Sequence, residues 1–293
     1  MYQVLIKDHL GNFIEDQTVC DGTAPTVVTG TQCLVPMSAL WVAPFQHGQG
    51  AEVLAQVRAH NARGWSTISP TTTSPGGALV ETVPQALSAP TRGLATTDSV
   101  LQSDWLAPVG AAATGGSAIV GYALYWDDAT SSPGPPVWTE LVGASATHTA
   151  LTYSRTTGIV GGETYAVYVA ARNKWGWGPD SPIASILAAT TPGAPGIPVT
   201  AIDVASGAVT ITWTAPTATG GVTTDSYVIE ILGGDALTWR QDAACDGTNS
   251  GIVAALTCTV PMTSLVATAV ASDHALAFDS LVLVRVSGVN VRG

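Results

Sequence analysis

The sequence has little charge and few of the runs that build long helices. Only 11% of its 293 residues are Asp, Glu, Lys or Arg, and long stretches of Leu, Glu and Lys are missing. Thr, Val and Ala are abundant instead, which favours strands over helices. The hydrophobic fraction of 46% is too high for a disordered tail, and the 31 Gly and 18 Pro follow no collagen period. We therefore predict a folded, all-β protein.

Positive charge and long apolar runs are also scarce. The chain has 10 Lys and Arg against 21 Asp and Glu, and the positive residues form no basic cluster. A net charge of −11 repels phosphate backbones, so nucleic acid is not an expected partner. No run of about eighteen apolar residues exists, so the sequence predicts no membrane span.

Motifs that carry catalysis are missing. The five histidines show no metal-ligand spacing, and neither a GxSxG elbow nor a phosphate-binding loop occurs. We expect no catalytic, cofactor-binding or metal-binding residue and predict that the protein is not an enzyme. His47 and His274 fall in corresponding loops, and we interpret them as solvated side chains rather than as a metal or pH site.

The chain has only four cysteines, and they occur in two copies of one segment. CDGTAPTVVTGTQCLVPM begins at Cys20, and CDGTNSGIVAALTCTVPM begins at Cys245. Equal spacings in a β-rich chain suit local disulfides, whereas CxxC and Cys/His metal spacings are absent. We predict the bridges Cys20–Cys33 and Cys245–Cys258, and with them an extracellular location.

The rest of the chain repeats as well. Residues 2–6 match 227–231, residues 61–64 match 290–293, and the middle of the chain carries related segments. This gives three copies of a unit of roughly one hundred residues. Period-two alternation in 122–126, 165–169 and 209–213 indicates antiparallel β-sandwiches. Trp105 and Trp213 are the predicted apolar anchors of their cores.

The order of motifs in the middle copy carries a family resemblance. A Trp strand, Ala-Pro, Gly-Gly and a Tyr strand are followed by Gly-Glu-Thr-Tyr, alternating Val residues and an Asn-x-x-Gly turn. This order resembles a fibronectin type III domain. The resemblance implies that Tyr165 forms a tyrosine corner, its hydroxyl bonding back to the turn before its strand. Val53 and Val282 replace it in the outer copies, so that bond is expected only in the middle copy. In the outer copies the resemblance also implies that each disulfide staples an extended crossover and that the second cysteine enters strand E.

A second resemblance rests on the cysteine segments alone. The spacing from Cys to Cys, followed by Val-Pro-Met, is similar to that in repeat-bearing surface proteins of ciliates and other protists. It covers residues 20–65 and 245–293.

The fibronectin resemblance implies three domains of unequal completeness. Residues 1–82 form a partial domain with strands C to G and a disulfide, 83–190 a complete domain, and 191–293 a domain with a disulfide but no strand G. Either the chain is a window of a longer array that alternates cysteine and cysteine-free domains, or other copies supply the missing strands. Both alternatives remain open. Pro84 and Pro192 open the later domains and predict semi-rigid linkers.

Three tryptophans beside basic residues are candidate surface contacts: Trp65, Trp175 and Trp177. They could pack structurally, for instance at a domain joint, or contact a partner protein, or stack on sugar rings.

Together these features predict a non-enzymatic extracellular structural protein without cofactors, a subunit or repeat segment of a surface fibre or matrix. Its expected partners are copies of itself, joined head to tail with a possible donor strand, and glycans or other surface proteins. The alternative is a carbohydrate- or protein-binding accessory region of a larger secreted enzyme or adhesin.

Overall fold

The computed structural model describes residues 1–72, 77–127, 135–266 and 274–293. Its strands are short and pair antiparallel, which confirms the predicted all-β class with fibronectin type III-like sandwiches. We call residues 1–82, 83–190 and 191–293 the first, middle and third repeats, and this division stays a prediction. The structure itself groups the chain into two compact units. Unit 1 is Met1–Thr91, Ser103–Tyr153 and Ala166–Ala184, and unit 2 is Arg92–Gln102, Ser154–Tyr165 and Ser185–Gly293.

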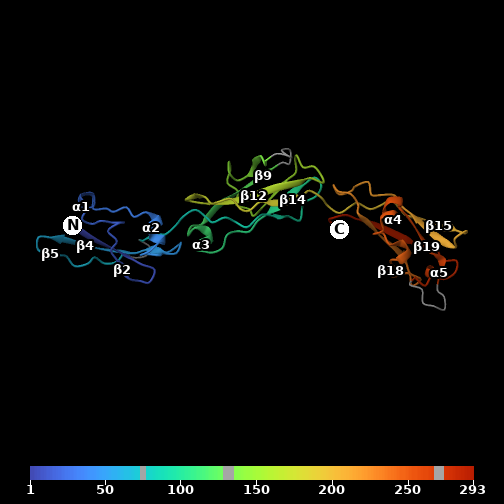
Figure 1. The fold of residues 1–293 in the computed structure, drawn as a ribbon, viewed down its shortest axis with the longest axis horizontal. Helices are drawn as coiled ribbons and strands as arrows, with labels where there is room; N and C mark the ends of the chain where they lie inside the picture. The colour runs from blue at the N-terminus through green and yellow to red at the C-terminus, as the bar shows by residue number, and fades with distance from the viewer. Residues whose placement is uncertain (73–76, 128–134, 267–273) are drawn as a thin grey trace. The chain divides into compact units, whose positions relative to one another are not determined.

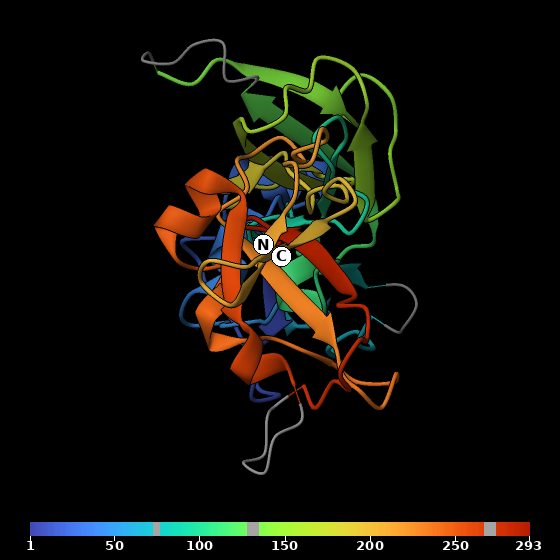
Figure 2. The same cartoon turned by 90° about the vertical axis from the view of Figure 1, so that its right-hand side faces the viewer.

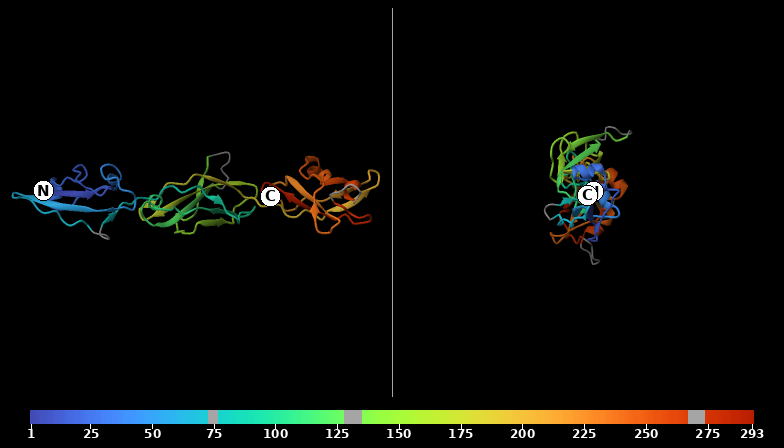
Figure 3. Two further views of the ribbon diagram at one scale, coloured as in Figure 1. Left: turned by 90° about the horizontal axis from the view of Figure 1, so that it is seen from below. Right: turned by 90° about the vertical axis from the view of Figure 1, so that its left-hand side faces the viewer.

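The first repeat contains one four-stranded sheet. Its order is β2 (Phe13–Ile14), β1 (Tyr2–Lys7), β4 (Ala55–Asn61) and β5 (Gly64–Trp65). The blue strands β1 and β4 run side by side in Figure 3. A separate pair joins β3 (Glu52–Val53) to β6 (Ala78–Leu79).

The inner face of this sheet is covered only at one end. Alternation along β1 places Tyr2, Val4 and Ile6 on the same face. Ile6 packs in a small core with Leu40, Phe45 and Val80, whereas Tyr2 and Val4 are only half-buried. In the described part of this repeat, β3–β6 is the only strand pair besides this sheet.

The middle repeat has two sheets, one of five strands and one of three. One sheet is drawn in green to yellow in Figure 1, and the strand order is consistent with the predicted complete domain. Trp105 is buried and its ring meets that of Tyr122 edge-on at 6.0 Å, as an anchor of the core should. The strands are β10 (Trp138–Val142), β9 (Ile119–Asp127), β12 (Thr164–Asn173), β13 (Gly176–Trp177) and β14 (Ala184–Leu187) in one sheet, and β11 (Thr152–Arg155), β8 (Leu101–Asp104) and β7 (Thr91–Arg92) in the other.

The third repeat has two three-stranded sheets. Their inner faces enclose a core in which Trp213 lies edge-on to Tyr227, with ring centroids 5.3 Å apart. Trp213 is therefore the second core anchor, as predicted. The orders are β15 (Val199–Asp203), β16 (Ala208–Thr212), β19 (Thr257–Pro261) and β18 (Trp239–Arg240), β17 (Ser226–Leu232), β20 (Val284–Val289).

Short helices interrupt the two cysteine segments, which we predicted to be extended crossovers. That prediction is wrong for α1 (Pro25–Gly30) and α4 (Ser250–Ala255). Pro25 suits the first turn of a helix, and the Asn249 side chain accepts a hydrogen bond from the Gly251 amide as an N-cap. Figure 2 shows the orange helices of the third repeat beside its strands. The other helices are α2 (Met37–Trp41), α3 (Ala111–Thr114), the 3-10 turn η1 (Ala243–Cys245) and α5 (Met262–Leu265). Within the described ranges, no helix has the length and apolarity needed to cross a bilayer.

Candidate functional site: the cysteine segments, the open groove and the joints

The Cys-Asp-Gly-Thr motif is a turn that closes on itself. The Asp21 carboxylate accepts hydrogen bonds from the Thr23 amide and hydroxyl, and Asp246 does the same with Thr248. The Thr23 hydroxyl bond lowers the pKa of Asp21, and the Thr248 amide bond lowers that of Asp246. These carboxylates therefore stabilise their own turns.

The glycine of the motif lies against β1 in the first repeat and against β17 in the third. The Tyr2 amide donates to the Gly22 carbonyl at 2.8 Å, and the Tyr227 amide donates to the Gly247 carbonyl at 3.0 Å. A Cβ on Gly22 would lie 2.0 Å from the Tyr2 carbonyl oxygen, and one on Gly247 would lie 1.9 Å from that of Tyr227. Only glycine allows this approach.

The predicted disulfides Cys20–Cys33 and Cys245–Cys258 are both present. The described residues contain no free cysteine. In the third repeat Cys258 lies in β19, which pairs with β16. In the first repeat Cys33 lies outside any strand, although we predicted that the second cysteine of each copy enters strand E. That prediction is wrong for the first repeat, where none of the described strands pairs with this segment.

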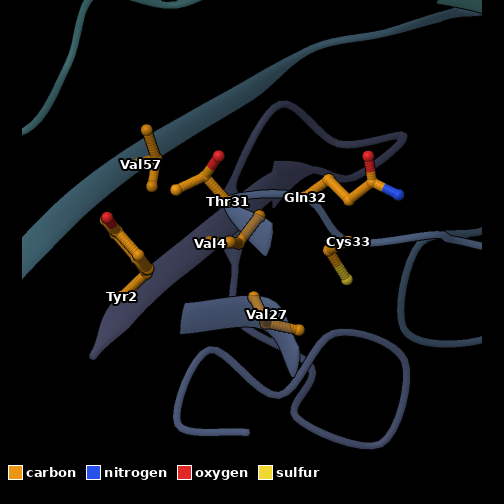
Figure 4. Close-up of a pocket in the computed structure, with 7 residues that line it drawn as sticks. All are labelled: Tyr2, Val4, Val27, Thr31, Gln32, Cys33 and Val57. Carbon is orange, nitrogen blue, oxygen red and sulfur yellow. The ribbon is translucent and has the colours of Figure 1, made fainter. Parts of the chain in front are cut away.

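An open apolar groove lies beside Cys33. It has a volume of about 240 Å³ and is lined by two residues of β1, one of α1, one of β4 and the segment around the cysteine. Figure 4 shows these side chains around one opening: Tyr2, Val4, Val27, Thr31, Gln32, Cys33 and Val57. No sequence motif marks the groove, because its lining comes from segments that lie far apart in the chain.

The three candidate tryptophans do not come together in one site. Each carries a cation over its ring: Arg58 lies 4.6 Å from the ring centroid of Trp65, Lys174 5.6 Å from that of Trp175, and Arg172 5.6 Å from that of Trp177. Trp65 and Trp175 are exposed, whereas Trp177 is half-buried. Cation–π pairing of this kind is a surface packing arrangement, and it leaves the ring faces of Trp65 and Trp175 partly open.

Trp175 also takes part in the joint between the first and middle repeats. Its indole Nε1 donates to a carboxylate oxygen of Glu81 at 3.2 Å, and Lys174 forms an ion pair with the same oxygen at 2.6 Å. The Lys174 bond lowers the pKa of the nearly buried Glu81. Trp175 therefore contacts the end of the first repeat through Glu81.

Asn173 stabilises this joint through two hydrogen bonds. The sequence analysis did not predict this role. The Asn173 amide donates to the Thr82 carbonyl of the linker and to the Thr114 carbonyl of the next loop, at 2.6 and 2.9 Å. The Thr82 amide donates to the Gly115 carbonyl at 2.8 Å. The signal was present in the repeated Asn of residues 61, 173 and 290 and in the repeated Thr-Gly-Gly.

The joint before the third repeat is built from the same bonds. The Asn290 amide donates to the carbonyls of Thr190 and Thr219 at 2.9 and 3.1 Å, and the Thr190 amide donates to Gly220 at 2.9 Å. Both joints therefore use one asparagine to hold a linker threonine against a Thr-Gly-Gly loop.

The two loop histidines differ from expectation. His47 and His274 are both buried, not solvated. His274 Nε2 lies 3.3 Å from a carboxylate oxygen of Asp242, so this ring is held inside its repeat. No group of three or more potential ligands in the described chain could hold a metal ion.

Comparisons with known proteins place the chain only by its fold. No family model matches it, and no curated protein matches it. Among solved structures, the FN1–FN3 domains of chicken CNTN1 have 16% identity and a TM-score of 0.43, covering 100% of this chain and 84% of that one. A group of titin domains has 16% identity and a TM-score of 0.33, covering 64% and 54%. The sixth fibronectin type III domain of a human fibronectin type III domain containing protein has 20% identity and a TM-score of 0.29, covering 38% and 90%. At these identities and TM-scores, the similarities say nothing about function.

Proposed function

We propose that the chain is a non-enzymatic extracellular structural protein, a subunit or repeat segment of a surface fibre or matrix. The observation that carries the proposal is the reuse of one joint. Asn173 and Asn290 make the same pair of bonds, to the linker threonine and to the Thr-Gly-Gly loop of the repeat that follows the linker. When each repeat contacts its neighbour through the same bonds, an array grows by adding units without a new interface.

Two further features support this proposal. The disulfides brace the cysteine segments, as expected in an oxidising compartment. Three acidic side chains are used in turns and at a joint: Asp21, Asp246 and Glu81 all accept hydrogen bonds from their neighbours. Copies of the chain are the proposed partners, joined head to tail, and the resemblance to protist surface proteins remains part of this proposal.

Electron microscopy of the negatively stained protein, with sedimentation at increasing concentration, tests the proposal. Filaments or concentration-dependent oligomers are expected. Dispersed monomers at all concentrations, in both measurements, would contradict assembly by copies.

The joint has its own test. Asn290→Ala removes two bonds at the joint before the third repeat, so the two repeats should lose their common alignment in residual dipolar couplings measured by NMR. Asn249→Ala is the matched control, because Asn249 caps α4 within the same repeat and touches no linker. Unchanged alignment in Asn290→Ala would contradict the role of the asparagine.

A carbohydrate-binding accessory role is the second candidate. The exposed rings of Trp65 and Trp175 favour it, because an aromatic face beside a loop can stack on a sugar ring. A glycan array with the intact chain tests it. Binding that Trp65→Ala or Trp175→Ala abolishes, without loss of folding, would establish this role, and an array without binding would exclude it for the glycans displayed.

A further inference from the structure

The segment that follows β5 runs beside β4 without forming a strand. We call residues 66–72 the edge segment. Three of its backbone amides donate to carbonyls of β4: Ser66 to Ala59 at 2.8 Å, Ser69 to Val57 at 2.9 Å and Thr72 to Ala55 at 3.1 Å. Three residues of the edge segment therefore span the distance that two residues of β4 span. In a regular antiparallel pair, bonded residues recur at every second position on both strands.

Hydroxyl groups take the place of backbone carbonyls in this pairing. The amides of the same three β4 residues donate to side chains of the edge segment, each at 3.0 Å: Ala59 to Ser66 Oγ, Val57 to Ser69 Oγ and Ala55 to Thr72 Oγ1. In a regular sheet the acceptors are carbonyl oxygens. The edge segment therefore satisfies the amides of β4 without adopting the spacing of a strand.

The hydroxyls also occupy two carbonyls of the edge segment itself. Ser66 Oγ donates to the Thr67 carbonyl at 2.9 Å, and Ser69 Oγ donates to the Pro70 carbonyl at 3.0 Å. Pro70 has no amide hydrogen to donate. A further strand needs evenly spaced donors and acceptors along the edge that it joins. The edge segment offers fewer of both.

The middle repeat contains a single copy of the same arrangement. The Val169 amide donates to Ser181 Oγ at 3.0 Å, and the Ser181 amide returns a bond to the Val169 carbonyl at 2.9 Å. Gly178 and Ala184 stand where the edge segment has Ser66 and Thr72, so neither position carries a hydroxyl. From Ala184 the chain forms the strand β14, which pairs with β12. A regular strand thus forms in the middle repeat where the hydroxyls end.

The opposite edge of the sheet in the first repeat is short. The strand at that edge, β2, has only two residues. Very short edge strands are one of the ways in which natural sheets avoid pairing with other chains. The edge segment therefore lies along the longer edge of this sheet, where strand addition would otherwise be favourable.

We propose that the edge segment closes the sheet of the first repeat against strand addition by other chains, through the hydroxyls of Ser66, Ser69 and Thr72. It covers β4 without presenting a regular edge of its own. Copies of the chain therefore do not merge side by side along this edge. The inference goes beyond the proposed function, because it holds for the folded chain whether or not copies assemble.

Hydrogen exchange of a variant without the three hydroxyls, Ser66→Ala/Ser69→Ala/Thr72→Val, tests the contacts. The amides of Ala55, Val57 and Ala59 should exchange at least about fivefold faster, because they lose their acceptors. Thr67→Val is the control, since the exposed Thr67 lies in the same segment but bonds to no β4 amide. Equal exchange in the two variants would overturn the inference.

Sedimentation velocity at increasing concentration tests the closure of the edge. Without the hydroxyls the segment straightens or separates from β4, and either change exposes a regular strand edge. The variant should therefore form larger species than the wild-type protein and Thr67→Val at each concentration. In these species the amides of β4 or of the edge segment should be protected from exchange. Unchanged sizes, or larger species without this protection, would overturn the inference.

Two milder variants keep the test decisive if the triple substitution unfolds the repeat. Thr72→Val and Thr67→Val exchange the same hydroxyl for a methyl group at two places in one segment. Only Thr72→Val should expose the Ala55 amide and increase association, and equal behaviour would contradict the proposal. Ser69→Thr keeps a hydroxyl and should match the wild-type protein in both measurements. Because the wild-type protein is the baseline throughout, failure of the proposed fibre would leave this result unaffected.

Discussion

At the scale of single residues, the Tyr165 hydroxyl serves a turn that has no other partner for one of its amides. It accepts a hydrogen bond from the Val160 amide at 2.8 Å and lies 3.5 Å from the Gly158 carbonyl, to which it donates. This is the corner that the fibronectin resemblance implied. Its position could be predicted because one tyrosine at the start of a strand determines it.

Tyr165→Phe should lower the free energy of unfolding of the middle repeat by about 1 kcal/mol, since it leaves the Val160 amide without its acceptor. Native-state hydrogen exchange of the β12 amides measures the change. Tyr153→Phe is the control, because its hydroxyl forms no hydrogen bond within the described part of the chain. Equal effects of the two substitutions would contradict the role of the corner.

Position 22 requires glycine because a larger side chain would not fit there. Gly22→Ala should destabilise the first repeat by about 1–3 kcal/mol, because the new Cβ would overlap the Tyr2 carbonyl and force the motif away from β1. Gly30→Ala is the matched control, since a Cβ at Gly30 meets nothing within 4 Å. Urea denaturation of both variants makes the comparison, and a Gly22→Ala variant as stable as Gly30→Ala would rule the clash out.

At the scale of elements, the disulfides hold segments that packing alone secures poorly. The Cys245–Cys258 bridge ties η1 to β19 across the short helix α4. In the double variant Cys245→Ser/Cys258→Ser, the third repeat should lose about 3 kcal/mol, because the unfolded chain regains the freedom of the closed loop. Hydrogen exchange of β17 and β20 amides measures the loss. The cysteine-free middle repeat is the internal control, and unchanged exchange in the third repeat would refute the brace.

Parts of these repeats could be predicted from the sequence, and parts of the cysteine segments could not. Strands β1, β4, β17 and β20 were predictable, because their alternation is local and the copies match. Cys33 was predicted to enter a strand like Cys258, but a strand needs a partner, and pairing is a long-range property. The short helices were missed because the composition argued for strands throughout, although Pro25 and Asn249 are local helix-start signals.

At the scale of the whole molecule, the ion pair at the first joint makes the stability of that joint depend on pH. Glu81 sits at the first joint, and its bond with Lys174 keeps the pKa of the carboxyl below its ordinary value of 4.5. A carboxyl whose pKa is lowered by folding stabilises the folded state above the unfolded pKa. That stabilisation is lost as the pH falls through the lower, folded value.

Glu81→Gln should therefore destabilise the joint near neutral pH by about 1 kcal/mol, a modest value because Lys174 is 58% exposed. The difference from the wild-type protein should shrink as the pH falls below about 4. Denaturation at a series of pH values measures it. Glu163→Gln, on an acidic residue away from this joint, is the control, and a difference that persists in acid would contradict the ion pair.

The unpaired segment around Cys33 has a consequence for how long the protein lasts outside a cell. Proteases bind their substrates as extended backbone, and Leu34 is 90% exposed on a segment whose backbone makes no hydrogen bond to the described residues. A chymotrypsin-like protease should cut first after Leu34, while the matching Thr259 is protected by the β16–β19 ladder. Mass spectrometry of a brief digest identifies the first cut.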